Sequence, residues 1–419
     1  MKPLFATRVA MFVGGLTLVL STSLCSAQDW PQWRGPNRDG KVTGFTPPAA
    51  WPKSLNQKWS VTVGLGDATP AVVGDKVYVF AMQENDEVTL CLDAQTGKSV
   101  WEDKYAPHTT ISGAPSRHGQ GPRSSPAVAE GKVVTLGFSG ILSCLDAASG
   151  KVVWRKQFDK DFKKTAPQFF VATSPIIMNG MCLAHVGGQG NGALIAFDLN
   201  TGDKKWEWAG EGPAYASPVL MSIDGKQAIV EEGEKSLVGV DASTGKLLWQ
   251  APFAGRGMMA YNAATPIVDG STIICTGHGT TAFKIEKDGD ALAAKELWNN
   301  ADTGTQFNTP VLKDGKLYGL SSKQNFFTMD AQTGKLLWND TGRHGQFGAI
   351  VDAGAVLMAL TQDGQLAILK PADKQLEEVT NYKVAEGGTF AHPVVVGNRI
   401  YIKDKDSLKL LSVDGQVAS

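Results

Sequence analysis

Short apolar runs separated by polar turns recur along almost the whole chain. In the clearest copy, residues 309–312, 317–320 and 327–330 are strand-like runs, and an Asp-Gly-Lys turn joins the first two. A second turn, Ala-Gln-Thr-Gly-Lys, leads into a fourth run at residues 336–338. Asp330 can accept a hydrogen bond from the backbone of this turn, and Gly334 can adopt a positive φ. The pattern predicts a unit of four antiparallel strands.

Eight copies of this unit follow one another. A turn and strand of the type Asp-Ala-x-Thr-Gly-Lys-x-x-Trp end at Trp101, Trp154, Trp206, Trp249 and Trp338, with a degenerate copy at Trp298. The first strands start at Pro70, Pro126, Pro175, Pro218, Pro266, Pro310 and Pro393, and without proline at Ala349. The spacing suits one four-stranded propeller blade. The sequence therefore predicts an all-β fold, a single eight-bladed β-propeller of four-stranded blades.

The two ends of the repeat array complement each other. The last copy stops after residues 414–415 without its Trp-bearing strand, whereas residues 57–61 form a Trp-bearing strand without the rest of a blade. Pairing these fragments would close the ring and remove exposed sheet edges, whereas a linear solenoid would carry capping repeats at its ends. We expect the N-terminal strand to pair with the last blade, within a propeller domain that spans residues 53–419.

The first 27 residues resemble a targeting segment. Lys2 and Arg8 precede an apolar run at residues 9–20 that is too short to span a bilayer, and small residues follow at the expected cleavage site. Cys25 raises the alternative of a lipoprotein, but Leu24 stands where lipoprotein signals have a small residue. We expect a cleaved signal peptide (residues 1–27), an N-terminal extension (residues 28–52) and a periplasmic or secreted protein with no transmembrane segment.

Composition and charge exclude several classes of function. Lys and Arg number 40 against 41 Asp and Glu, so no basic excess indicates nucleic-acid binding. Four cysteines follow the signal segment, and none is adjacent to another. They lie in apolar runs, so we expect buried thiols rather than a disulfide framework or a metal site. The cysteines are Cys91, Cys144, Cys182 and Cys275.

The repeated motif, the Ser/Thr-Pro starts and the opening Asp-Trp-Pro-Gln-Trp-Arg-Gly-Pro at residues 29–36 resemble the pyrroloquinoline-quinone-like (PQQ-like) propeller-repeat proteins. The resemblance covers nearly the whole chain after residue 27. The superfamily includes quinoprotein alcohol dehydrogenases, the outer-membrane-protein assembly lipoprotein BamB and exported proteins without assigned activity. The resemblance thus implies the fold but does not choose among these functions.

The resemblance to the quinoprotein enzymes is incomplete. Those dehydrogenases commonly have an adjacent Cys-Cys pair beside the quinone, carboxylate and Asn ligands for calcium, and a catalytic Asp. Here most Asp residues belong to repeated turns, and no Cys-x-x-Cys-His offers a haem site. The glycine-rich residues 187–192 and the acidic residues 286–290 are typical of turns between strands. We therefore expect no catalytic residues, no metal site and no cofactor, with PQQ and calcium as the alternative.

One face of the predicted propeller carries unusual residues. We call "turn face" the face with the turns after the first and third strands of each blade, and "interblade face" the face with the loops between blades and after second strands. Histidines, arginines and aromatics gather on the interblade face, His185 and His278 after second strands and the others in loops between blades. Inner strands line the channel of a propeller, so these residues should ring its mouth. The candidate binding residues are Arg117, His118, Arg123, Phe170, His185, Tyr215, Tyr261, His278, Phe307, Arg343, Phe347 and His392.

These observations predict an exported, non-catalytic binding or scaffolding module of the bacterial cell envelope. Its partner would be an envelope protein or a small polar ligand, bound by a monomer at the interblade face. Two alternatives remain: a PQQ-dependent dehydrogenase that uses the same channel mouth, and an outer-membrane-protein assembly factor similar to BamB.

Overall fold

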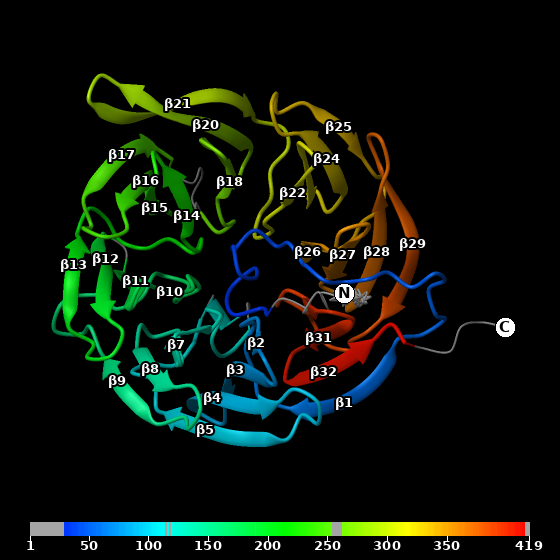
Figure 1. Cartoon of the computed structure of the whole chain (residues 1–419), viewed down its shortest axis with the longest axis horizontal. Helices are drawn as coiled ribbons and strands as arrows, with labels where there is room; N and C mark the ends of the chain where they lie inside the picture. The colour runs from blue at the N-terminus through cyan, green and yellow to red at the C-terminus, as the bar shows by residue number, and fades with distance from the viewer. Residues whose placement is uncertain (1–28, 114, 117–118, 189, 254–261, 415–419) are drawn as a thin grey trace, which may run out of the picture.

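Eight four-stranded antiparallel sheets stand around a central axis as the blades of a propeller (Figure 1). The computed structural model describes residues 29–113, 115–116, 119–188, 190–253 and 262–414. The eight-bladed all-β fold predicted from the repeats is confirmed. None of the helices within these residues is long and apolar enough to cross a membrane.

The strands fall into four concentric sets, numbered here from the axis outward. The innermost strands are β2 (Ala71–Val73), β6 (Ala127–Ala129), β10 (Ile176–Met178), β14 (Val219–Ile223), β18 (Ile267–Asp269), β22 (Val311–Lys313), β26 (Gly348–Asp352) and β30 (Val394–Val396). The second strands are β3 (Lys76–Gln83), β7 (Lys132–Leu136), β11 (Met181–Gly188), β15 (Lys226–Glu232), β19 (Thr272–Thr276), β23 (Lys316–Leu320), β27 (Leu357–Thr361) and β31 (Arg399–Lys403).

The third and outermost strands complete the blades. The third strands are β4 (Asp86–Asp93), β8 (Leu142–Asp146), β12 (Asn191–Asp198), β16 (Ser236–Asp241), β20 (Thr280–Asp288), β24 (Phe326–Asp330), β28 (Gln365–Pro371) and β32 (Ser407–Ser412). The outermost strands are β5 (Ser99–Tyr105), β9 (Val152–Lys156), β13 (Lys204–Trp208), β17 (Leu247–Pro252), β21 (Ala291–Asn300), β25 (Leu336–Asn339), β29 (Leu376–Lys383) and β1 (Asn56–Thr62).

Burial explains the apolar pattern of each set. The second and third strands of blade 1, β3 and β4, are buried along their length because neighbouring blades cover both of their faces. Their sequences are accordingly almost continuous apolar runs. The outermost strand β5 contacts the core only on alternate residues, so exposed positions alternate with partly buried ones. Each blade therefore becomes more polar from the middle strands to the outermost strand.

The repeated turn is specified by its own side chains. In blade 1, Asp93 Oδ1 accepts hydrogen bonds from the backbone N–H groups of Gln95 (3.1 Å) and Thr96 (2.9 Å). It also accepts one from the Thr96 hydroxyl at 2.8 Å, and these bonds lower the pKa of Asp93. Gly97 follows with φ of +69°. The predicted role of the repeated aspartates as turn formers is confirmed, since Asp330 makes the same contacts.

Each of these turns also holds the tryptophan of the preceding blade. The Trp101 indole N–H of blade 1 donates to Ala147 O of blade 2 at 3.1 Å, and its ring lies so close to Gly150 that a Cβ there would approach it to 2.5 Å. Trp154 and Trp206 repeat this arrangement against the turns of blades 3 and 4. The Gly and the Trp of the motif are therefore two halves of one joint between blades.

The N-terminal strand closes the ring with the same joint. β1 pairs antiparallel with β32, placing Trp59 opposite Leu410, and so becomes the outermost strand of blade 8. The Trp59 indole N–H then donates to Ala94 O of blade 1 at 3.2 Å, and its ring packs against Gly97. The predicted closure by the N-terminal strand is confirmed.

Other local expectations also hold. The four cysteines after the signal segment are buried and free, as expected for small apolar side chains. The glycine-rich residues 187–192 lie where β11 pairs with β12, and the acidic residues 286–290 lie in the hairpin of β20 and β21. The described residues of both segments are paired strand ends and turn residues, as expected for turns between strands.

The closing joint predicts the effect of one methyl group. Gly97→Ala places a Cβ 2.9 Å from the Trp59 ring and keeps a residue at positive φ, so overpacking should add to backbone strain. Gly225→Ala is the matched control, because Gly225 has φ of +75° in another turn with nothing within 4 Å. In denaturant unfolding, Gly97→Ala should lower the free energy of unfolding by about 1–3 kcal/mol more than Gly225→Ala. Equal losses would show that the joint carries no strain.

Candidate functional site

The centre of the ring is filled by the protein's own N-terminal segment. Residues 29–42, here called the axial segment, run inside the ring of inner strands, as the blue chain in the middle of Figure 1 shows. Trp30 exchanges two backbone hydrogen bonds of 2.8 Å with Val72 of blade 1, and Pro31 O accepts from Val128 N of blade 2. Val42 N donates to Asp352 O of blade 7 at 2.8 Å. The channel expected from the fold is therefore occupied.

Two buried arginines hold the axial segment against the starts of inner strands. Arg34 Nη1 donates to Thr309 O (3.1 Å), and its Nη2 donates to Pro310 O (3.0 Å), both in blade 6. Arg38 donates to Ser174 O and Pro175 O of blade 3, each at 2.8 Å. Burial lowers the pKa of Arg34 to about 10 and of Arg38 to about 9, so both guanidinium groups stay charged at neutral pH. The carbonyl groups at the proline-containing starts of these two inner strands are thus satisfied by charged hydrogen-bond donors.

A buried histidine and glutamate stand beside Arg38. His185 Nδ1 lies 3.2 Å from Glu231 Oε1 of blade 4, and its Nε2 lies 3.0 Å from Glu211 O. A carbonyl accepts only, so Nε2 carries a proton, while Nδ1 faces the Glu231 carboxyl group at ion-pair distance. Burial raises the pKa of Glu231, and the contact with Glu231 raises the pKa of His185 against the effect of burial. The positive charge of Arg38 acts on the same carboxyl group.

These contacts correct the expected position of His185. The sequence pattern placed it in a loop after a second strand, but it lies inside β11, opposite Leu194, with 1% of its surface exposed. β11 is longer than β7 and β19, the equivalent strands of blades 2 and 5, because it continues into the glycines at its end. His185 is therefore a wall residue between blades 3 and 4 rather than an open ligand-binding group.

Three predicted residues meet on the interblade face near blades 2, 3 and 4. Arg123 Nη1 donates to Phe169 O at 2.7 Å, and the Tyr215 hydroxyl accepts from Phe169 N at 3.1 Å. Phe170, at φ of +64°, packs edge-on against Phe138 with ring centroids 5.6 Å apart. Arg123, Phe170 and Tyr215 are all half-buried. Together they form an aromatic cluster in which a hydrogen bond from Arg123 links one loop to the next.

Buried charged groups of both signs, Asp67, Arg123 and Lys403, lie close to this cluster. Burial raises the pKa of Asp67 to about 6, while Arg123 and Lys403 act in the opposite direction. Lys403 is fully buried, donates to Asp404 O at 2.7 Å, and has its pKa lowered to about 8 by burial. Perturbed groups of this kind can mark catalytic sites. Here the positive charges of Arg123 and Lys403 act on the Asp67 carboxyl group. The cluster is an internal brace of blades 8, 1 and 2.

The remaining predicted residues do not form one site. His392 and Phe347 are buried, and the Phe347 and Phe390 ring centroids lie 5.4 Å apart, with Phe390 37% exposed. His278 and Arg343 are exposed on separate loops, and Phe307 is half-buried. Arg117, His118 and Tyr261 lie outside the described residues. The structure therefore divides the candidates into buried wall residues and a partly exposed rim.

Sequence reasoning assigned the axial segment to a simple N-terminal extension and so missed Trp33, Arg34 and Arg38. Arg34 and Arg38 are almost fully buried, as is the neighbouring Trp30. A signal was present, because two tryptophans and two arginines within residues 30–38 are unusual for a solvent-exposed linker. The repeat period could not place them, since the axial segment belongs to no repeat.

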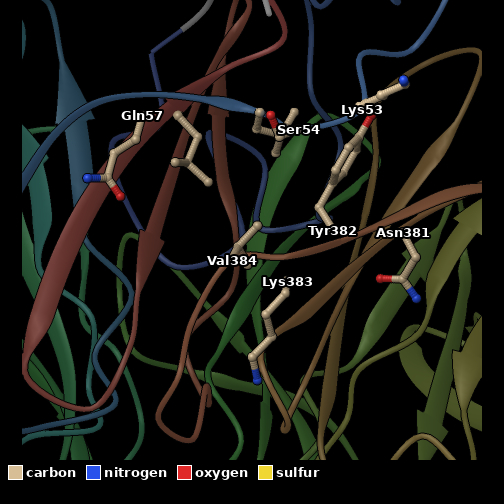
Figure 2. A pocket seen from close by; sticks show the side chains of 9 residues that line it. Lys53, Ser54, Gln57, Asn381, Tyr382, Lys383 and Val384 are labelled. Atoms are coloured by element: carbon tan, nitrogen blue, oxygen red, sulfur yellow. The ribbon is translucent and has the colours of Figure 1, made fainter. Parts of the chain in front are cut away.

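A shallow pocket lies at the closing seam, away from the axis. It has a volume of about 220 Å³ and is lined by Lys53, Ser54, Leu55, Gln57, Asn381, Tyr382, Lys383, Val384 and Leu411. Figure 2 shows Lys53 and Lys383 pointing in opposite directions, and Lys383 Nζ donates to Asp363 O at 2.7 Å. The Tyr382 hydroxyl donates a hydrogen bond to Pro52 O at 2.8 Å. Its polar groups diverge, so this pocket is not a convincing ligand site.

Comparison with known proteins places this arrangement in context. Residues 84–294 and 288–415 match the family model described as outer membrane protein assembly factor BamB. A protein of that name from Shewanella oneidensis is 26% identical over 262 residues, which cover 58% of this chain. The match spans 62% of that relative, which is under two thirds of its length.

Two solved structures share the fold. BamB from Moraxella catarrhalis superimposes with a TM-score of 0.64 at 15% identity, covering 87% of this chain and 99% of that chain. Quinohemoprotein alcohol dehydrogenase from Comamonas testosteroni gives a TM-score of 0.69 at 17% identity, covering 93% of this chain and 81% of that one. At such identities these likenesses concern architecture alone, and a binding protein and an enzyme fit equally.

The axial segment should contribute measurably to stability through Arg38. Arg38→Met leaves Ser174 O and Pro175 O without their donors and removes a cation from Glu231, so the free energy of unfolding should fall by about 3 kcal/mol. Lys41→Met, an exposed position on the same segment, should change it by less than about 0.5 kcal/mol. Denaturant unfolding followed by tryptophan fluorescence measures both. Equal stability of the two variants would contradict the assigned role of Arg38.

Proposed function

This chain belongs to the outer membrane protein assembly factor BamB family, and on that premise we propose that it is a non-catalytic scaffolding propeller of the bacterial cell envelope. Within that role we propose that it assists the assembly of outer-membrane proteins by holding a protein partner. The observation that carries the proposal is the filled axis, because it leaves recognition to the surface. The predicted signal peptide at residues 1–27 is consistent with an envelope location, and the lipoprotein form at Cys25 stays the alternative to it.

The chemistry of the axis supports a role without a cofactor. A quinone with calcium would need an open pocket and converging oxygen ligands. The axis instead holds Trp33, Arg34 and Arg38, and the two guanidinium groups occupy carbonyl oxygens at the starts of inner strands. Within the described part of the chain, no group of three or more His, Cys, Asp or Glu side chains could hold a metal ion. These residues do not fit the quinone and calcium of the dehydrogenases.

The interblade face is the better docking surface of the two. Its rim combines the exposed Arg343 and His278 with the partly exposed Phe390, and arginine and aromatic residues are enriched at protein interfaces. On the turn face, by contrast, the aspartates already accept bonds from their own turns. A partner protein could contact several loops of the rim at once, which favours a protein over a small polar ligand.

The docking face can be tested in cells that lack this chain, where we expect outer-membrane protein content to fall. Restoring Arg343→Ala combined with Phe390→Ser should leave that content close to the level of the deletion. The matched control, Lys246→Ala with Lys335→Ala on the turn face, should restore it. Quantitative mass spectrometry of outer membranes measures the outcome, and immunoblotting verifies equal amounts of both variants. Full restoration by the Arg343 and Phe390 variant would show that the interblade face is not the docking face.

A further inference from the structure

The tip of the axial segment rests against a buried histidine. Trp33 packs edge-on against the His392 imidazole of blade 8, with ring centroids 4.7 Å apart, while its indole N–H donates to Thr265 Oγ1 at 2.8 Å. His392 is 3% exposed, and its backbone N–H donates to Thr69 Oγ1 at 3.0 Å. Its Nδ1 is buried and meets no hydrogen-bond partner within the described residues. The imidazole therefore lies in a site built for its neutral form.

The charged group that acts on His392 comes from the axial segment itself. Arg34, the residue after Trp33, is fixed by Thr309 O, Pro310 O and Asp39 O. Burial lowers the pKa of His392 well below 6.5, and the positive charge of Arg34 lowers it further. Among the described residues, no carboxylate contributes to this shift. A proton on Nδ1 would meet neither an acceptor nor a counter-ion there. The bound position of Arg34 therefore favours the neutral form of His392, and the neutral form favours the bound position of Arg34.

We propose that His392 makes the seating of the axial segment sensitive to acid. The neutral imidazole can pack against Trp33 close to Arg34 without a charge conflict, whereas an imidazolium would bury a second positive charge next to Arg34. Protonation would then loosen the segment from the mouth of the channel. This device is independent of partner docking on the rim, and it would open the axis when the envelope becomes acidic.

The sign of the effect follows from proton linkage. With the segment seated, the pKa of His392 is depressed, and with the segment released it returns towards its ordinary value of about 6.5. Below that pH the released state binds a proton that the seated state lacks, so the seated state loses stability as pH falls. One group that titrates at about 6.5 in the released state changes the equilibrium about fivefold between pH 6.5 and 5.5, and the change approaches tenfold per pH unit only below that range. Above about pH 6.5 the seating should be independent of His392.

The other buried histidine near the segment cannot supply this effect. His185 faces Glu231 and the backbone and side chain of Glu211, and its pKa is raised. The native site therefore favours the proton on His185, which stabilises the folded state in acid rather than releasing Arg38. Acid release is accordingly assigned to His392, where no acidic partner is present in the described residues.

Hydrogen exchange of the full mature chain tests the proposal. Peptides covering the axial segment report the amides of Trp30, Gly35, Arg38, Gly40 and Val42, which are hydrogen-bonded in the seated state. Their protection, corrected for intrinsic exchange, should fall about fivefold between pH 6.5 and 5.5. Peptides from β31 should keep their protection, which separates local release from global unfolding.

Variants identify the titrating group. His392→Gln keeps a neutral polar side chain and should show no pH dependence in this range. His344→Gln is the matched control, because His344 pairs with Asp340 (2.6 Å) in the loop after β25 and should leave the wild-type response unchanged. If His392→Gln does not fold, Arg34→Met provides the second test, since removing the cation should weaken the pH dependence. Equal responses in wild type and His392→Gln, or constant protection of the wild type down to pH 5.5, would overturn the proposal.

Discussion

Tryptophan against glycine is the contact on which the ring depends. Trp59, Trp101, Trp154 and Trp206 each project from the outermost strand of one blade, donate the indole N–H to a turn carbonyl of the next, and lie where only a residue without Cβ leaves room. Trp298 packs against Gly334 in the same way without this hydrogen bond. A sheet of four strands cannot bury both of its faces alone, and this joint fixes the distance at which neighbouring blades cover each other. Because blade 8 ends at β32, the last joint exists only when β1 supplies Trp59.

The same N-terminal region then completes the inside of the ring. Seven of the eight inner strands follow a proline, and in blades 3 and 6 the carbonyl groups at these starts face the axial segment, where water or a ligand would otherwise have to satisfy them. Arg34 and Arg38 satisfy such carbonyls in blades 6 and 3, and backbone bonds tie the segment to blades 1, 2 and 7. The N-terminal region therefore closes the ring and fills its centre. This leaves the surface loops as the place where a partner would bind.

The fold could be predicted because its determinants are local and repeated. The Asp-x-x-Thr-Gly-Lys turn, the Pro starts and the missing strand of the last copy each follow from bonding within or between adjacent blades. The site was harder, because it depends on a segment without a repeat. His392 and Phe347 look like mouth residues by register, yet the axial segment and neighbouring rings bury them. His185 faces Glu231 across a blade interface that no sequence spacing encodes.

Whether the axis is filled can be tested by adding pyrroloquinoline quinone with calcium to the purified mature protein. After gel filtration, the quinone absorbance that remains with the protein is measured, together with dye reduction in the presence of alcohols or sugars. We expect the protein to retain no quinone and to reduce no dye, because Trp33, Arg34 and Arg38 occupy the axis. Retention of one quinone per chain with dye reduction would contradict this expectation and establish the dehydrogenase alternative.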